Sequence, residues 1–199
     1  MCCGIMSGYK MLLRLYSQAE VWREVKIRDD ITFEQLHFVI QKLFGFSDYH
    51  NYEFQIPHND PDDDLVNLGN LKGTIGYDEC GDIIISEILE DNPILLYVYD
   101  FGDNWEIIVH KLEDVADYKN KTALITDYKG KYNPIDDMGG LFVFEEILEA
   151  VDDGDVEIVL DDYGLRKSDL TKMDFEKKYE IGSRIRCVRE MKRGYYLSV

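Results

Sequence analysis

Several signals that would classify this 199-residue chain are scarce or missing. No apolar run reaches the roughly 18–20 residues that a membrane helix needs. Only four histidines and four cysteines are present, and no two cysteines form a CxxC pair, so zinc-site and disulfide-framework spacings are absent. The GxSxG, HExxH, P-loop and GxGxxG motifs are absent as well. No residue is therefore predicted to be catalytic.

The start of the chain lacks the features of a secretory signal. Its first eight residues, MCCGIMSG, have no basic start and no long apolar centre. A cytoplasmic location with reduced thiols is therefore expected, without a membrane partner. Residues 1–8 are expected to be a flexible N-terminus, and residues 9–199 a single α+β domain, because domains usually run to about 100–200 residues.

Positive charge is in short supply. Lysine and arginine total 22 against 40 acidic residues, which gives a net charge of −18. A field of this sign repels phosphate backbones, so nucleic acid is not the expected partner. The basic residues gather in 166–193, with ten Lys or Arg against five acids, whereas 145–162 holds nine acids and no base. The basic segment could dock on the acidic stretch, bind a phosphate group or be solvated, and docking is the preferred hypothesis.

Apolar and aromatic residues are plentiful, and their periodicity predicts the elements of the fold. Hydrophobic residues make up 45% of the chain, which is ample for a packed core. Alternating patterns predict an opening hairpin, with Val21, Arg23, Val25 and Ile27 on one face, and a central hairpin, with Trp105 and Val109 on one face. The predicted strands are 9–17, 20–27, 51–56, 94–99, 105–112, 122–127 and 195–199.

Helical spacing predicts four helical segments. The strongest runs from Thr32, which forms a capping box with Gln35, to a stop at Gly45. His37 lies beside the apolar stripe of this helix, and a buried histidine with a hydrogen-bond partner is favoured over a ligand role. The other segments are 86–90, 141–151 and 155–163. Loops are expected at 57–64 and 132–140, and irregular chain with short extended pieces at 65–82. Together these elements predict an α+β fold, with a curved, mainly antiparallel or mixed sheet built from hairpins and packed helices.

The turn at residues 100–104, DFGDN, is the most distinctive local pattern. Gly102 permits positive φ, and Asp100, Asp103 and Asn104 can cap turn amides, which favours a structural role. The alternative is functional. The carboxylates of Asp100 and Asp103 could converge with Asp136 and Asp137 of the loop at 132–140 and hold a divalent cation or a cationic ligand.

The central hairpin carries a resemblance to a known family. YDFGDNWE at 99–106 closely resembles the YDFGDxWeH motif of the plasmid pRiA4b ORF-3-like family, also labelled IS1096 element passenger TnpR family. Other segments are similar in the same order, over about residues 9–186. They are VWREV at 21–25, LHFVIQKLFGFSDYHNYEF at 36–54, NPIDDMGG at 133–140 and, more weakly, MDFEKKYEIGSRI at 173–185.

The resemblance implies a compact α+β fold with a curved sheet and packed helices, and no established biochemical role. His50 matches the family's histidine after the helix. Ile107 replaces the histidine that ends YDFGDxWeH. In NPIDDMGG, which is similar to the family's PPEDxGG loop, Asp136 replaces the glutamate, and Phe46 replaces the tryptophan that follows the family's helix. A site that required a histidine at position 107 would therefore be incomplete in this chain. Some members carry resolvase labels, which a net charge of −18 does not support.

The first functional hypothesis is a cytosolic binding or interaction domain without catalysis. Its acidic, aromatic-rimmed site would take a cationic peptide, a basic protein surface or a metal ion. No cofactor is predicted, although the carboxylates could hold a divalent cation. A metal-assisted or acid–base hydrolase using the same carboxylates is the alternative, and a mobile-element accessory protein is a further one. The predicted site residues are His50, Tyr99, Asp100, Asp103, Trp105, Glu106, Asp136 and Asp137.

Overall fold

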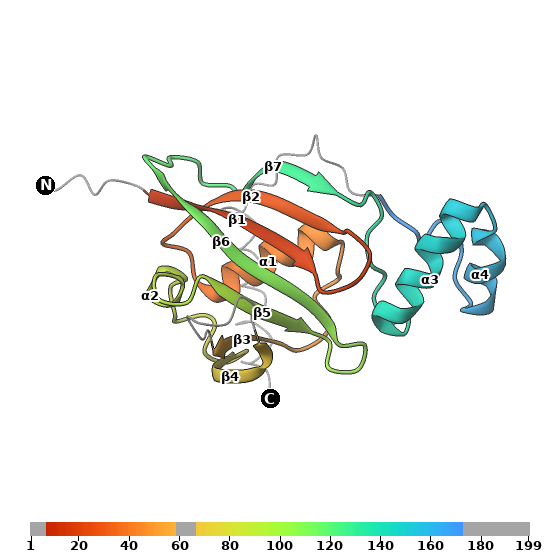
Figure 1. Ribbon diagram of the computed structural model, residues 1–199, viewed down its shortest axis with the longest axis horizontal. Coiled ribbons are helices and arrows are strands. Elements are labelled where there is room, and N and C mark those ends of the chain that lie inside the picture. The colour runs from red at the N-terminus through yellow and green to blue at the C-terminus, as the bar shows by residue number, and fades with distance from the viewer. Residues whose placement is uncertain (1–6, 59–66, 173–199) are drawn as a thin grey trace, which may run out of the picture.

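The computed structural model of the protein describes residues 7–58 and 67–172 (Figure 1). Several predictions fall outside these residues. They are most of the flexible N-terminus at 1–8, most of the loop at 57–64, the terminal strand at 195–199 and the basic segment beyond 172.

Within the described residues, seven strands form one open antiparallel sheet in the order β4-β3-β5-β6-β1-β2-β7. Both predicted hairpins are confirmed, since β1 pairs with β2 and β5 pairs with β6. The fold is α+β, although the sheet dominates over the helices. The strands are β1 Ser7–Leu15, β2 Trp22–Arg28, β3 Tyr52–His58, β4 Asn67–Gly76, β5 Ile94–Tyr99, β6 Trp105–Ala116 and β7 Leu124–Lys129.

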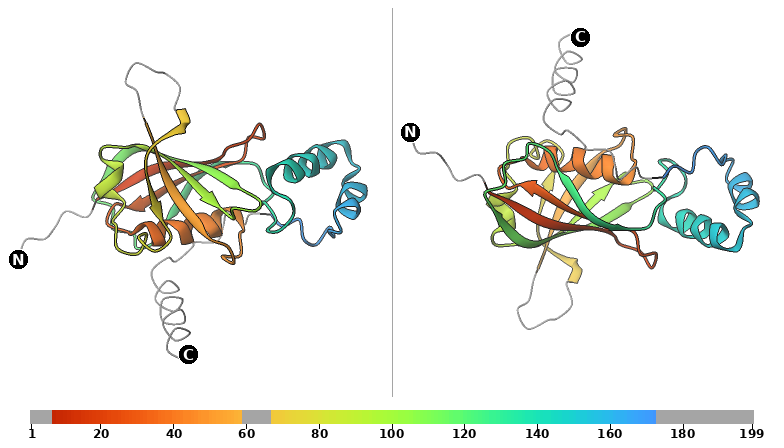
Figure 2. Two further views of the ribbon diagram at one scale, coloured as in Figure 1. Left: turned by 90° about the horizontal axis from the view of Figure 1, so that it is seen from below. Right: turned by 90° about the horizontal axis from the view of Figure 1, so that it is seen from above.

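The helices occupy two places relative to the sheet. α1 Phe33–Phe44 lies along one face of the sheet, while α3 Gly140–Asp153 and α4 Val156–Asp162 lie together beyond one end of it (Figure 2). The short α2 Ser86–Leu89 precedes β5. None of the helices in the described ranges has the length and apolar character that crossing a membrane requires.

The predicted capping box at the start of α1 is confirmed. The Thr32 hydroxyl oxygen accepts a hydrogen bond from the Gln35 backbone N–H, and the Gln35 side chain accepts one from the Thr32 backbone N–H. These two bonds satisfy backbone donors that the first helical turn cannot pair. At the other end Gly45 takes a left-handed conformation, and its N–H donates to the Gln41 carbonyl. The Phe33 ring of α1 packs edge-on against Phe54 of β3.

Replacing Thr32 with alanine should lower the free energy of unfolding by about 1 kcal/mol, because one orphan donor loses its acceptor. Urea denaturation followed by circular dichroism would measure the loss. A Thr32→Ser variant keeps the hydroxyl and is the control, which should stay within about 0.5 kcal/mol of the unchanged protein. Equal losses in both variants would contradict the capping role.

The strand β2 places Arg23 in the core, as its alternation predicts. Val21, Val25 and Ile27 are buried on the same face, and Arg23 is itself fully buried. The Arg23 guanidinium donates to backbone carbonyls in three elements. Its Nη1 donates to the Trp22 and Lys129 oxygens at 2.8 and 2.6 Å, and its Nε donates to the Leu43 oxygen at 3.3 Å. Arg23 therefore ties α1 to β2 and β7.

The segment at 65–82, predicted as irregular chain with only short extended pieces, contains the ten-residue strand β4. This strand pairs with β3 along Glu53↔Gly76 to His58↔Asn67, with two register shifts. The glycines of β4 lower its strand propensity and interrupt any alternating pattern in the sequence. The strand forms because its backbone hydrogen-bonds to the neighbouring strand β3, which outweighs that low propensity. The strand β3 also continues through Pro57 and His58, where a loop was predicted.

The described part of the basic segment contacts the acidic helices at one point. Lys167 Nζ lies 3.0 Å from Glu157 Oε1 of α4, and both side chains are exposed. Arg166 pairs instead with Asp169, within the segment itself. The docking hypothesis therefore has one supporting contact, and residues 173–193 lie outside the described ranges.

Candidate functional site

The turn between β5 and β6 is built by its own polar side chains. Asp100 and Asn104 both have positive φ, 56° and 51°, a conformation that Asp and Asn tolerate better than most residues. The Asn104 N–H donates to the Asp100 carbonyl, and Asp100 Oδ1 accepts from the Gly102 N–H at 2.9 Å. One oxygen of the buried Asp100 carboxylate thus caps its turn, and Oδ2 remains for another partner.

The loop preceding α3 is seated on this turn through two glycines. The Gly139 N–H donates to Asp103 Oδ2 at 3.2 Å. Gly140 has φ of +77° and passes so close that an added Cβ would lie 2.3 Å from the Asp103 carbonyl oxygen. Asp103 therefore links the two loops, because its carboxylate accepts a hydrogen bond from the Gly139 backbone amide.

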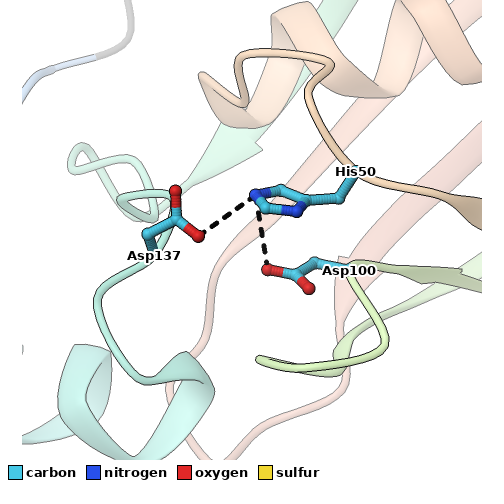
Figure 3. Close-up of side chains that lie close together, drawn as sticks. All are labelled: His50, Asp100 and Asp137. Carbon is cyan, nitrogen blue, oxygen red and sulfur yellow. Dashed lines mark ion pairs between the residues drawn. The ribbon is translucent and has the colours of Figure 1, made fainter.

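His50 joins Asp100 and Asp137 in one cluster (Figure 3). His50 Nε2 lies 3.2 Å from Asp137 Oδ1 and 3.6 Å from Asp100 Oδ2. One ligand atom from each residue lies within 4.8 Å of the other two. His50 Nε2 is buried and makes no hydrogen bond within the described residues, whereas the Asp137 side chain is 72% exposed. The cluster therefore combines a buried imidazole nitrogen, in ion-pair range of two carboxylates, with one open side.

Asp136, the neighbour of Asp137, faces a different set of partners. Its Oδ2 accepts from the Ser47 N–H at 2.6 Å and lies 3.5 Å from the Tyr99 hydroxyl. Burial raises the pKa of the Asp136 carboxyl, while the Ser47 hydrogen bonds and the nearby His50 oppose that rise. Asp136 Oδ1 is buried without a hydrogen bond within the described residues. Asp136 therefore anchors the loop before His50 and is not one of the three converging residues.

The predicted aromatic residues form the floor of this region and not its rim. Tyr99 and Trp105 are fully buried, and both pack against Phe46, with ring centroids 4.8 and 5.5 Å away. Burial raises the pKa of the Tyr99 hydroxyl. The exposed aromatic side chains next to the cluster are Tyr49 and Phe101, which precede and follow two of its residues in the chain.

Glu106 is the last of the predicted site residues, and it pairs with the Asn104 amide at 3.0 Å. Three of the eight predicted residues therefore converge, namely His50, Asp100 and Asp137. Sequence reasoning singled out all three. It did not associate Ser47 or Asp48 with the site, because neither has a pattern that marks a loop-anchoring role.

The donor set of the cluster suits a divalent cation. Two carboxylate oxygens and one imidazole nitrogen are ligands used by zinc, manganese and related first-row ions, whereas calcium and magnesium prefer oxygen alone. The two carboxylates would balance the charge of such an ion. Because the side chains of Asp100 and Asp137 come from separate loops, the fold and not a local motif assembles this set.

Comparison with known proteins places the chain in a family. The family model for plasmid pRiA4b ORF-3-like protein matches residues 7–176. This chain belongs to that family. The chain is also similar to the uncharacterized protein y4hQ of Sinorhizobium fredii (strain NBRC 101917 / NGR234), with 25% identity over 135 residues. That match covers 67% of this chain and 66% of the relative, just under two thirds of its length.

A solved structure shares the fold. The crystal structure of a protein of unknown function, MM3350 from Methanosarcina mazei Go1, matches with a TM-score of 0.68 and 23% identity. The match covers 88% of this chain and 98% of that protein. At this identity the likeness shows the fold alone.

Membership of the plasmid pRiA4b ORF-3-like family gives the cluster a context. His50, Asp100 and Asp137 come from three different segments that carry the family resemblance, and the fold brings those segments together. Ile107, in the place of the motif's histidine, is fully buried on the core face of β6, beside Trp105 and Val109. A side chain at position 107 therefore lies in the core and not at the cluster.

Proposed function

We propose that this protein is a non-catalytic binding domain that takes a divalent metal ion at the His50–Asp100–Asp137 cluster. The observation that carries the proposal is the approach of two carboxylates from separate loops to a buried imidazole nitrogen that lacks a hydrogen bond. A buried polar atom without a partner costs free energy, and a bound cation would remove that cost.

Two of the three ligand separations in the cluster are close to those around a bound ion. Ligand atoms around a zinc-sized ion lie about 3.0–3.4 Å apart, given metal–ligand bonds of about 2.0–2.1 Å. The His50–Asp137 separation of 3.2 Å falls in this range, and the His50–Asp100 separation of 3.6 Å is slightly longer. Asp137 is exposed, so its side chain has room to adjust.

Three protein ligands leave coordination positions for water or for a group of a partner molecule. This arrangement suits a binding domain, because a metal-bound partner would be held at the exposed side, where Asp137 is open to solvent. A cationic peptide is the competing ligand, since an arginine or lysine side chain would also pair with Asp100 and Asp137. A cytosolic setting, as expected from the sequence, supplies both kinds of ligand.

Isothermal titration of the full chain with Zn²⁺, Mn²⁺, Mg²⁺ and Ca²⁺ tests the proposal. Zn²⁺ or Mn²⁺ should bind at one site and raise the melting temperature, because an ion at 100 times its Kd adds about 2.7 kcal/mol of stability. His50→Ala should weaken this binding at least about 100-fold, since it removes the only nitrogen ligand of the cluster. Mg²⁺ and Ca²⁺ should bind more weakly.

His58→Ala is the matched control, because His58 is an exposed histidine at the end of β3. It should leave zinc affinity unchanged. Equal affinity in the His50→Ala variant and the unchanged protein would overturn the metal site, as would no saturable binding at millimolar ion. Tight binding of a polyarginine peptide that depends on Asp100 and Asp137 would replace the metal with a cationic peptide. Turnover of p-nitrophenyl esters or phosphates by the metal-loaded protein would favour the hydrolase.

A further inference from the structure

The loop that carries His50 is held by side chains outside the metal-binding cluster. Three consecutive backbone N–H groups donate to them: Ser47 to Asp136 Oδ2, Asp48 to Gln41 Oε1 and Tyr49 to the Tyr99 hydroxyl. Asp48 has a positive φ of 58°. A non-glycine residue in this conformation needs its surroundings to hold it there.

Four side chains and one backbone amide close a hydrogen-bonded ring next to this loop. His37 Nε2 lies 2.9 Å from Asp48 Oδ1, and His37 Nδ1 lies 2.7 Å from the Tyr97 hydroxyl. Gln41 Nε2 donates to the Tyr97 hydroxyl oxygen at 3.0 Å, and Gln41 Oε1 accepts from the Asp48 N–H at 2.9 Å. The ring therefore runs from Asp48 through His37, Tyr97 and Gln41 back to Asp48.

The Asp48 N–H fixes the direction of two bonds in the ring. Because Gln41 Oε1 accepts from the Asp48 N–H, its amide nitrogen must donate to Tyr97. The Tyr97 O–H then has His37 Nδ1 as an acceptor in the His37 tautomer that carries its proton on Nε2, and that tautomer donates to Asp48 Oδ1. Burial raises the pKa of the Tyr97 hydroxyl, which keeps the donated proton in place.

We propose that His37 and Tyr97 are positioning residues that set the place of His50 in the metal cluster. The proposal rests on the metal-binding function above and adds to it the residues that control affinity. Tyr97 lies in β5, three residues before Asp100, and Asp48 lies two residues before His50. The ring thus ties the His50 loop to the strand that leads into Asp100, and so it controls the His50–Asp100 separation.

Two neighbouring contacts act in the same direction. The Asp100 N–H donates to the Asn51 carbonyl at 3.0 Å, and the Tyr99 hydroxyl accepts from the Tyr49 N–H at 3.2 Å. His37 also stacks on Tyr52, with ring centroids 3.5 Å apart, which fixes the plane of its ring. Hydrogen-bonded groups behind metal ligands orient them, and their loss typically weakens metal binding about 10–100-fold.

A comparison of Tyr97→Phe with Tyr52→Phe tests the proposal in the full chain. Both variants remove one buried tyrosine hydroxyl, but Tyr52 bonds Cys80 and is not a member of the ring. Tyr97→Phe should weaken Zn²⁺ binding about tenfold, and Tyr52→Phe less than about twofold, even if both lower the melting temperature equally. Amide hydrogen exchange at residues 47–49 of the metal-free protein should become at least about tenfold faster in Tyr97→Phe alone.

Rescue at Asp48 separates positioning from general stability. Asp48→Asn keeps an acceptor for His37 and tolerates positive φ, so zinc affinity should stay within about threefold, whereas Asp48→Ala should lose about tenfold. Equal zinc affinity and equal exchange in Tyr97→Phe and Tyr52→Phe would overturn the positioning role. If the unchanged protein binds no ion, the proposed function fails, and faster exchange at 47–49 in Tyr97→Phe alone would still support loop positioning.

Discussion

Replacing Gly140 with alanine should lower the free energy of unfolding by about 2–5 kcal/mol. Its φ of +77° already costs an alanine about 1–2 kcal/mol, since a Cβ in this region meets the following carbonyl. The new Cβ would also lie 2.3 Å from the Asp103 carbonyl oxygen, so the chain must shift, and such overpacking typically costs about 1–3 kcal/mol. Chemical denaturation would measure the sum.

Gly154→Ala is the matched control for Gly140. Its φ is +90°, and an added Cβ would meet nothing within 4 Å. Gly154→Ala should therefore lower the free energy of unfolding only by the cost of the left-handed conformation, about 1–2 kcal/mol. The close approach at Gly140 also holds the loop of Asp137 against the hairpin of Asp100, so Gly140→Ala should weaken zinc binding and Gly154→Ala should not. Equal stability losses would contradict the close contact between Gly140 and Asp103.

The second large effect is expected at Arg23. Arg23→Ala should cost about 3–5 kcal/mol, because it opens a cavity in the core and removes the donor from three backbone carbonyls. Those carbonyls belong to α1, β2 and β7, so the loss should loosen the helix and the edge strand together. Urea denaturation gives the energy, and amide hydrogen exchange in β7 gives the local effect.

Two variants divide the Arg23 effect into its parts. Arg23→Met keeps most of the volume but no donor, so it should retain the packing contribution and still cost about 1–3 kcal/mol. Lys26→Ala, on the opposite face of β2, is the control and should stay within about 0.5 kcal/mol. A loss below about 1 kcal/mol for Arg23→Ala would show that solvent replaces its hydrogen bonds.

Local patterns were enough to predict much of the fold. The capping box at Thr32 and Gln35, the stop at Gly45 and the alternation in β2 and β6 all depend on contacts within one element or between adjacent ones. The prediction that His37 is a buried histidine with a hydrogen-bond partner is confirmed as well, although one partner, Tyr97, lies 60 positions away in the chain. Periodicity and capping report such short-range energetics directly.

Long-range pairing decided what the patterns missed. The strand β4 exists because β3 offers it hydrogen bonds, although its own glycines disfavour a strand. The buried Arg23 and the carbonyl oxygens that accept its hydrogen bonds lie up to 106 positions apart in the chain. No local stretch of sequence therefore shows that a guanidinium can find hydrogen-bond acceptors in the core.

By itself, the sequence determined an acidic turn at 100–104 inside a predicted hairpin and a second acidic loop at 132–140, and the family resemblance added His50 to the candidate residues. Only the tertiary structure separated the carboxylates by role. Asp103 and Asp136 anchor loops by accepting hydrogen bonds from backbone amides, while Asp137 and the second carboxylate oxygen of Asp100 converge on His50. That division depends on how loops near residues 50, 100 and 137 pack together, and packing between distant segments is not encoded in any local spacing.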